Sequence, residues 1–316
     1  MYDIAIIGSG PGGLSAAIYA ARARLSTLVI TGDEFGGQIA STHEVENYPG
    51  FDEGIMGPDL TRKMRAQAEK FGAEVVTDFI TDLDVDGLPF TLTGRLGTYE
   101  ARSVVVATGA SPRKLDIPGE AEFIGRGVSY CATCDGAFFP DVPVAVVGGG
   151  DSALQEGLFL NRFASKITVI HRRDELRAGA YLQQRVFNEP KFEFLWDSVA
   201  TEVVGEQGVQ QLRLKNLKTG EESTLDVEGV FIFVGHEPNT EIFAGKLDSD
   251  ERGYILADAH MRTSVPGIFV AGEAQDSHFR QAITTAGDGA KAAMEAIEYV
   301  ERLEEVAPAV SETTSV

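Results

Sequence analysis

The chain has 316 residues, of which 43% are hydrophobic and 24% charged, and its formal net charge at pH 7 is −21. This length accommodates about two domains, and the composition is that of a globular protein. The acidic balance, without a basic stripe to meet phosphates, argues against a nucleic-acid-binding protein and is compatible with either an ordinary acidic surface or adaptation to high salt.

The lack of a recognisable targeting signal and the cysteine usage both predict a cytoplasmic protein. No apolar run approaches the ~18 residues that span a membrane, and no signal peptide precedes the strand that begins at Tyr2. Cys131 and Cys134 are the only cysteines, whereas a secreted protein would spread several disulfides along the chain. We therefore expect a cytoplasmic protein that binds neither nucleic acid nor a membrane, in which the paired cysteines have a redox or metal-binding role.

A strand–turn–helix–strand pattern occurs twice in the chain. The first copy comprises the strand Tyr2–Ile7, the turn Gly8–Gly13, the helix Leu14–Arg24 and the strand Ser26–Ile30. The second copy, at an offset of 140 residues, comprises the strand Val142–Val147, the turn Gly148–Ala153, the helix Leu154–Arg162 and the strand Lys166–His171. Apolar strands joined by a helix indicate parallel strands buried on both faces, so the sequence predicts two βαβ dinucleotide-binding units.

Each unit is expected to close with one more strand. These strands are Ser103–Ala107 and Gly229–Val234, and the β-rich stretch with turn signals before each of them predicts an antiparallel meander. The last segment carries a strand over Gly267–Ala271 and a helix from Arg280 to about Leu303, which we expect to return to the first domain.

The predicted fold class is α/β, with two Rossmann-like, three-layer ββα dinucleotide-binding domains, the second inserted into the first. We assign residues 1–114 and 245–304 to the first domain and residues 115–244 to the second, with the chain crossing near Arg113–Gly119 and Pro238–Lys246. Residues 305–316, rich in Ser, Thr, Pro and Ala, are predicted to be a disordered tail.

The two glycine turns match the dinucleotide fingerprint at corresponding places, through Gly8, Gly10 and Gly13 and through Gly148, Gly150 and Ala153. The first glycine makes the turn, the second lets the backbone approach a pyrophosphate, and the third position allows close helix packing. One such match is weak, but two in a duplicated unit are specific. The first copy lacks an acidic residue at the end of its second strand, which reads Ile30-Thr31-Gly32, so its fingerprint alone does not identify the ligand.

The second copy indicates which nicotinamide nucleotide it prefers. Where an NAD site would carry an acidic residue, it has His171, Arg172 and Arg173, with Arg177 one turn beyond. Cations suit a 2′-phosphate, and two charge-assisted hydrogen bonds would favour NADPH over NADH by about 10²–10⁴-fold. The alternative, a solvated basic patch, is less attractive because cations are unfavourable at a helix N-terminus.

Cys131 and Cys134, with two residues between them, predict a small redox-active disulfide. A zinc site needs about four ligands, and the five histidines show no ligand spacing near the cysteines, so no metal is predicted. Asp135 follows directly and is a candidate general acid or base, although a surface turn would also explain it.

With these motifs, the chain closely resembles the low-molecular-weight thioredoxin reductases of bacteria and archaea, over roughly Tyr2 to Ala296. The resemblance implies a homodimer, thioredoxin as partner, Asp135 as the acid of the redox centre, and NADPH at Gly148, Gly150, Asp151, Ser152, Ala153, His171, Arg172, Arg173 and Arg177. It also implies FAD at the first site, beside Gly8, Gly10, Pro11, Gly12, Gly13, Gly36, Gly37, Gln38, Asn47, Thr108, Gly109, Ala110, Gly272, Glu273, Arg280, Gln281 and Ala282. Two stretches depart from the family pattern: Glu273 stands where Asp is usual, and the residues after Arg177 are less typical.

The expected activity is transfer of electrons from NADPH through FAD to the Cys131–Cys134 disulfide, and from there to the disulfide of thioredoxin or a similar protein. Nicotinamide and disulfide both need the flavin ring, so we expect the second domain to rotate about the two crossings. The alternatives are a disulfide reductase for another partner in a peroxidase system, a ferredoxin- or flavin-dependent reductase, a small-molecule dithiol oxidase, and a non-catalytic flavin-binding redox sensor.

Overall fold

A computed structural model describes residues 1–41 and 44–306 of the chain. They form two compact units: one runs from Met1 to Ser111 and resumes at Glu237, and the other, Pro112–His236, is inserted into it. The crossings lie on β9 (Ala110–Pro112) and β18 (His236–Pro238), which pair with each other. The units therefore divide after Ser111 and His236, whereas the sequence suggested residues 114 and 244.

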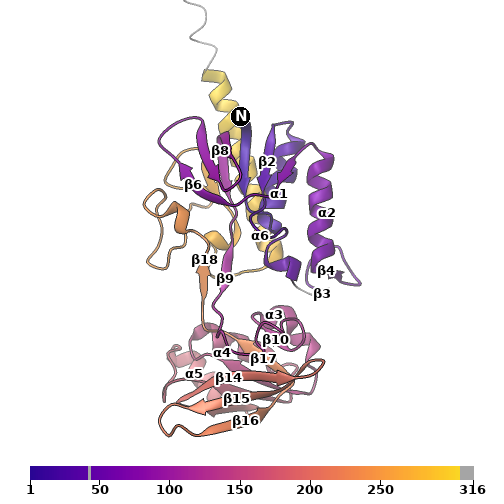
Figure 1. The fold of residues 1–316 in the computed structure, drawn as a ribbon, viewed down its shortest axis with the longest axis vertical. Coiled ribbons are helices and arrows are strands. Elements are labelled where there is room, and N and C mark those ends of the chain that lie inside the picture. The colour runs from indigo at the N-terminus through magenta and orange to yellow at the C-terminus, as the bar shows by residue number, and fades with distance from the viewer. Residues whose placement is uncertain (42–43, 307–316) are drawn as a thin grey trace, which may run out of the picture. The chain divides into compact units, whose positions relative to one another are not determined.

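A seven-stranded sheet forms the centre of the first unit (Figure 1). Its path is β5 (Glu74–Val76), β2 (Thr27–Ile30), β1 (Tyr2–Ile7), β8 (Thr98–Val106), β7 (Phe90–Gly94) and β6 (Ile80–Asp84), and β19 (Ile268–Val270) also pairs with β8. The β1, β2, β5, β8 and β19 pairings are parallel, and β6, β7 and the first half of β8 form an antiparallel meander. The smaller elements are β3 (Glu44–Val45), β4 (Ile55–Met56), η1 (Gln38–Ser41), η3 (Glu241–Phe243) and η4 (Gly272–Ala274).

Alternation along β1 divides the core of this unit into two layers. Ile4 and Ile6 pack on one face against α1 (Pro11–Arg22) and α6 (Ala282–Val306), while Ala5 and Ile7 pack on the other face with the meander. Successive side chains of a strand point to opposite faces, so a fully apolar strand needs a cover on each. The third helix, α2 (Gly57–Lys70), packs beside α1 over a small cluster around Leu60 and Met64.

The second unit repeats the plan with a separate meander. Its parallel sheet has the order β10 (Val128–Ser129), β17 (Gly229–Ile232), β11 (Pro143–Val147), β12 (Lys166–Ile170) and β13 (Phe192–Leu195). Helices cover one face of this sheet: α3 (Ala132–Asp135), η2 (Gly136–Phe138), α4 (Asp151–Leu160) and α5 (Ala180–Phe187). An antiparallel meander covers the other face: β14 (Ser198–Gly205), β15 (Val209–Asn216) and β16 (Glu222–Asp226). Both units therefore have the predicted three-layer architecture.

Several helices begin or end at other residues than the sequence predicted. The helices predicted from Leu14 and Leu154 begin earlier, at Pro11 and Asp151, and the last helix runs to Val306, beyond the start of the predicted tail. Pro11 stands in the first turn of α1, where a missing N–H costs no hydrogen bond. Residues 307–316 of the tail lie outside the described part of the chain.

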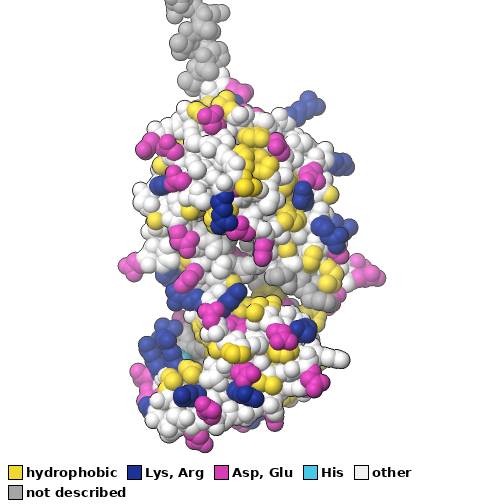
Figure 2. Space-filling view, viewed as in Figure 1, with side chains coloured by type: hydrophobic (Ala, Val, Ile, Leu, Met, Phe, Trp, Pro, Cys, Tyr) yellow, Lys and Arg dark blue, Asp and Glu magenta, His cyan; other side chains and the backbone are white. Residues whose placement is uncertain are grey.

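Acidic and basic side chains are interspersed over the visible face of the molecule (Figure 2). Among residues 1–41 and 44–306, every helix is too short or too polar to span a lipid bilayer. In the same residues, no three His, Cys, Asp or Glu side chains gather as a metal site would require.

Candidate functional site

The predicted redox centre lies in the second unit, directly after β10. Cys131 and Cys134 form a disulfide with a Cα–Cα distance of 5.3 Å. Cys131 is the N-cap of the short helix α3, and the backbone N–H of Cys134 donates to Cys131 Sγ at 3.2 Å. The turn thus holds the two sulfurs together and aims an amide at one of them, which favours a thiolate there after reduction.

Asp135 is connected to this turn through a buried serine. The hydroxyl of Ser129 donates to Asp135 Oδ2 at 2.6 Å, and the N–H of Cys131 donates to Ser129 Oγ at 3.0 Å. Burial raises the pKa of the Asp135 carboxyl above its usual range, although the hydrogen bond from Ser129 acts in the opposite direction. A carboxyl with a raised pKa beside a disulfide is suited to hold a proton for a sulfur that leaves as a thiolate.

A second carboxylate reaches the same turn from α4. Glu156 Oε2 accepts the N–H of Ala132, which follows Cys131, at 2.9 Å. Ala132 itself is fully buried. The cysteine turn is therefore fixed from two sides, by Ser129 on β10 and by Glu156 on α4.

The first glycine loop connects β1 to α1. A side-chain carbon on Gly8 would meet the Ala107 carbonyl oxygen at 2.2 Å, and one on Gly13 would meet the Gly8 oxygen at 2.0 Å, so both positions require glycine. A side-chain carbon on Gly10, by contrast, would have no described atom within 4 Å apart from those of Gly10 and its two chain neighbours. The loop is thus tight where it packs and open at its middle glycine, where the fingerprint expects a pyrophosphate to approach.

The other predicted FAD stretches meet this loop in the first unit. A side-chain carbon on Gly37 would lie 3.2 Å from Gly10 Cα, Gln38 Nε2 donates to the Ala110 carbonyl oxygen, and Asn47 Nδ2 donates to Gln281 Oε1 at 3.3 Å. Gly36 packs beside α2, Gly109 faces open space, Gly12 and Gly272 contact Thr285, and Ala282 begins α6. Gly8, Thr108 and Gly272 follow the carboxyl ends of β1, β8 and β19, which are neighbouring strands of one sheet.

Two buried hydroxyls show that this place fits a polar ligand. Thr108 Oγ1 and Thr285 Oγ1 are buried and have no hydrogen-bond partner among the described residues. Buried polar atoms are nearly always paired, and the hydroxyl- and phosphate-rich FAD molecule supplies both kinds of partner.

Glu273 lies at the same site with an altered acidity. Burial raises the pKa of Glu273 to about 7; Arg280 opposes this rise, Asp276 adds to it, and a hydrogen bond with Gln38 opposes it. The buried carboxyl therefore takes up a proton more readily than an exposed glutamate would.

The second glycine loop connects β11 to α4 in the second unit. Arg177 and Ala178 donate their backbone N–H groups to the Gly149 carbonyl oxygen at 2.8 and 3.2 Å, and Gly179 donates to Asp151 Oδ1 at 2.7 Å. The stretch after Arg177, which departs from the family pattern, therefore supports the loop, and Asp151 is engaged in that support. Gly148 has φ +146°, Ala153 is buried, and Ser152 is exposed.

Of the four residues predicted to bind the 2′-phosphate, one is buried and three are exposed. Arg172, Arg173 and Arg177 are exposed. His171 is buried, with its ring so close to Gly149 that any side chain there would clash, and its Nε2 has no partner among the described residues. Burial, together with the three arginines, lowers the pKa of His171, so the imidazole is neutral near pH 7 and supports the loop.

The sequence matches the family model of the pyridine nucleotide-disulphide oxidoreductases over residues 2–296. The chain belongs to this family. It is 50% identical to a thioredoxin reductase of Streptomyces coelicolor over 99% of this chain and 98% of the relative, and 48% identical to a bifunctional thioredoxin reductase/thioredoxin of Mycobacterium leprae over 94% of this chain and 65% of the relative. The crystal structure of thioredoxin reductase from Streptococcus pyogenes superposes with a TM-score of 0.91 at 46% identity, covering 96% of this chain and 99% of that one.

These matches confirm the predicted resemblance to thioredoxin reductases, the Rossmann-type fold, the oxidoreductase class and the cofactors FAD and NADPH. Sequence reasoning missed three residues of this oxidoreductase that the structure brings to the sites: Ser129, Glu156 and Thr285. Only Ser129 had a signal, its place two residues before Cys131. The fold, and no local pattern, places Glu156 on the Ala132 amide and Thr285 beside Gly12 and Gly272.

Proposed function

We propose that this protein reduces the disulfide of thioredoxin, or of a thioredoxin-like protein, with electrons from NADPH carried by FAD. The observation that carries the proposal is the Cys131–Cys134 disulfide with Asp135 beside it, in a chain with two dinucleotide loops. Two electrons break the disulfide, and the resulting thiolate attacks the disulfide of the partner. The second cysteine then displaces the reduced partner and restores the Cys131–Cys134 bond.

The remaining assignments are part of the same proposal. FAD is held by the first unit at the predicted residues, and NADPH by the second unit, with Arg172 and Arg173 on its 2′-phosphate. Asp135 keeps or returns the proton that the leaving sulfur needs. Because the disulfide and the nicotinamide must each reach the flavin, the second unit rotates about the crossings on β9 and β18. The protein is a cytoplasmic homodimer.

The test is anaerobic NADPH oxidation with a panel of thioredoxins and glutaredoxin-like proteins. We expect NADPH to bleach the yellow protein and thioredoxin to restore its colour. Cys134→Ser should abolish turnover while leaving NADPH able to bleach the flavin. A colourless protein that takes up no FAD, or full turnover of Cys134→Ser, would contradict the proposal. Reaction with oxygen and small dithiols but not with proteins would identify a dithiol oxidase instead.

A further inference from the structure

Glu156 is an acidic side chain in the middle of α4, at the edge of the stripe by which that helix is buried. Its neighbours Leu154 and Gly157 are buried, while Glu156 itself is half-buried and turns toward α3. There its Oε2 accepts the N–H of Ala132 at 2.9 Å. Ala132 lies inside the ring that the disulfide closes, so this negative charge is held next to the cysteine pair.

The cysteine turn has two backbone amides that bear on the charge of the sulfurs. The N–H of Cys134 points to Cys131 Sγ at 3.2 Å, whereas the N–H of Ala132 is already used by a carboxylate. Amide donors and positive charge near a cysteine stabilise its thiolate, and a carboxylate destabilises it. At this turn, an amide that could stabilise a thiolate is therefore occupied by a carboxylate, which brings a negative charge with it.

This arrangement affects the two oxidation states differently. The disulfide is uncharged, whereas addition of two electrons and one proton breaks the S–S bond and leaves one thiolate and one thiol. A dithiol whose reduced form is stabilised is a strong oxidant. A negative charge that disfavours the reduced form has the opposite effect and makes the dithiol a stronger reductant.

We propose that Glu156 is a positioning residue that lowers the reduction potential of the Cys131–Cys134 couple by placing its charge on the Ala132 amide. This inference rests on the proposed function, in which the dithiol must pass its electrons to another protein disulfide. Asp135, the other carboxyl at the turn, is bonded to Ser129 and has a different task, the supply of a proton.

The test is the reduction potential of the dithiol in the full-length protein with FAD bound. The protein is equilibrated without oxygen in buffers of reduced and oxidised dithiothreitol at about pH 8.5, where an ordinary cysteine is half ionised. Free thiols are then trapped by alkylation and counted by mass. Glu156→Gln keeps the shape and an acceptor oxygen but removes the charge, Glu156→Asp keeps the charge, and Glu222→Gln, on the exposed strand β16, removes a distant one.

We expect Glu156→Gln to shift the equilibrium toward the dithiol by about tenfold, which corresponds to about 30 mV for a two-electron couple. Glu156→Asp should restore much of the difference, and Glu222→Gln should leave the potential unchanged. An unchanged or lowered potential in Glu156→Gln, or an equal shift in Glu222→Gln, would overturn the inference. A lower melting temperature without a change of potential would likewise reduce Glu156 to a structural cap. Because the assay uses no thioredoxin, its result is independent of whether thioredoxin is the partner.

Discussion

The hydroxyl of Ser129 joins the carboxyl of Asp135 to the backbone of Cys131, by donating to Asp135 Oδ2 at 2.6 Å and accepting the Cys131 N–H at 3.0 Å. Ser129 is buried on β10, where it is aligned with Phe231 of β17. The strand that carries Ser129 is thus part of the central sheet, and the acid is fixed to the rigid part of the unit.

The first prediction concerns the proton that Asp135 handles. Asp135→Asn keeps the shape but cannot exchange a proton, so disulfide reduction should slow by about 10²-fold or more, while reduction of bound FAD by NADPH stays unchanged. Ser129→Ala removes a hydrogen bond that lowers the pKa of Asp135. Asp135 acts in its protonated form, so the rate falls as pH rises through its pKa, and this alkaline limb of the rate profile should move to higher pH in Ser129→Ala. Stopped-flow measurement of each half-reaction across pH checks both effects.

The matched control is Ser223→Ala, an exposed serine on β16. It should leave the rate profile in place. A full rate for Asp135→Asn would show that the proton comes from water, and a profile that Ser129→Ala does not move would mean that Ser129 has only a packing role.

The second prediction concerns the stability of the protein freed of FAD. Burial raises the pKa of Glu273 from 4.5 in the unfolded chain to about 7 in the folded one. Between these values the folded state binds more protons, so its stability is full below about pH 4.5 and falls as pH rises through about 7. At about 1.4 kcal/mol per pKa unit, the full loss amounts to about 3.5 kcal/mol, of which about 2–3 kcal/mol falls between about pH 5 and about pH 8.

Glu273→Gln cannot titrate, so its stability should not show this decline. Urea unfolding of both proteins at about pH 5 and about pH 8 gives the comparison, with the exposed Glu298→Gln as control. Equal pH dependence in wild type and Glu273→Gln would exclude Glu273 as the titrating group.

Both Rossmann-type units could be predicted because their strands are short apolar runs. In β1, Ile4 and Ile6 serve one face and Ala5 and Ile7 the other, and such a run has few other uses than a strand covered on both sides. The start of α1 was missed because Gly12 and Gly13 occupy its first turn, and glycine is a poor helix former. There the close approach of Gly13 to Gly8 outweighs propensity.

The site was predictable where a motif is local and not where it depends on the fold. The glycine loops and the cysteine pair can be recognised from spacing alone. That His171 would be buried against Gly149, while Arg172 and Arg173 stay exposed, follows from the side chain's direction at the end of β12. The hydrogen bond from Ala132 to Glu156 joins residues 24 apart on different helices, and no sequence pattern marks it.

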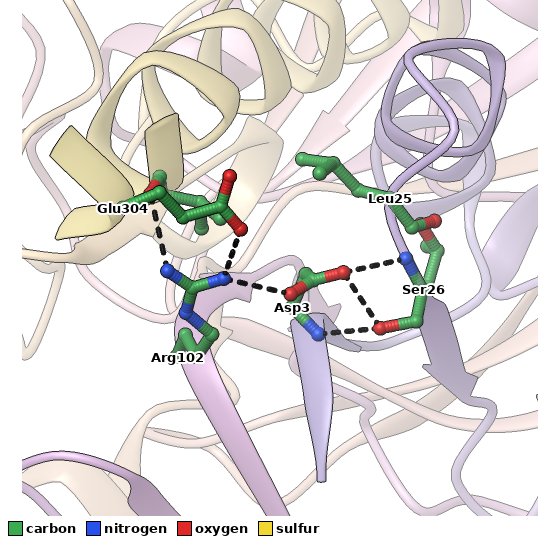
Figure 3. A network of polar contacts seen from close by, with 7 residues as sticks. Asp3, Leu25, Ser26, Arg102 and Glu304 are labelled. Atoms are coloured by element: carbon green, nitrogen blue, oxygen red, sulfur yellow. Dashed lines mark hydrogen bonds and ion pairs between the residues drawn. The ribbon is translucent and has the colours of Figure 1, made fainter. Parts of the chain in front are cut away.

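The third prediction concerns a polar cluster that fastens the last helix to the sheet (Figure 3). Arg102 of β8 donates to Asp3 Oδ1 at 3.1 Å and to Glu304 Oε1 at 2.7 Å, and Ser26 donates to Asp3 Oδ2 through its N–H and its hydroxyl. The Arg102 side chain is 20% exposed.

Arg102→Met should destabilise the protein by about 1–3 kcal/mol, because it leaves Asp3 part-buried without its cation.

Arg302→Met is the matched control. Arg302 lies on α6, as Glu304 does, and forms an exposed pair with Glu298 at 3.6 Å; such pairs contribute about 0–1 kcal/mol. Burial pushes the pKa of Asp3 upward, but hydrogen bonds from Ser26 and Arg102 lower it overall. The contribution of Asp3 is therefore present above its unfolded pKa of about 3.9 and is lost as pH falls through its lower folded value. Urea unfolding at neutral and acidic pH should show that the difference between wild type and Arg102→Met shrinks in acid. Equal losses in the two arginine variants would contradict a special role of this cluster.

The last prediction concerns the choice between NADPH and NADH. Arg172 and Arg173 follow β12 on an exposed loop, and Asp174 of the same loop is paired with Lys218 at 2.7 Å, so its negative charge is compensated. Two charge-assisted bonds at an exposed site are expected to contribute at the low end of about 1.5–3 kcal/mol each. The double change of Arg172 and Arg173 to Ala should therefore reduce the preference for NADPH by about 10²-fold, mainly through a higher KM for NADPH. The control is Arg185→Ala, which removes an exposed arginine on α5.

The ratio of kcat/KM for the two nucleotides measures the effect. An unchanged ratio in the double variant would mean that the 2′-phosphate is bound elsewhere. An equal fall of kcat/KM with NADH would mean that the arginines bind a group that both nucleotides share.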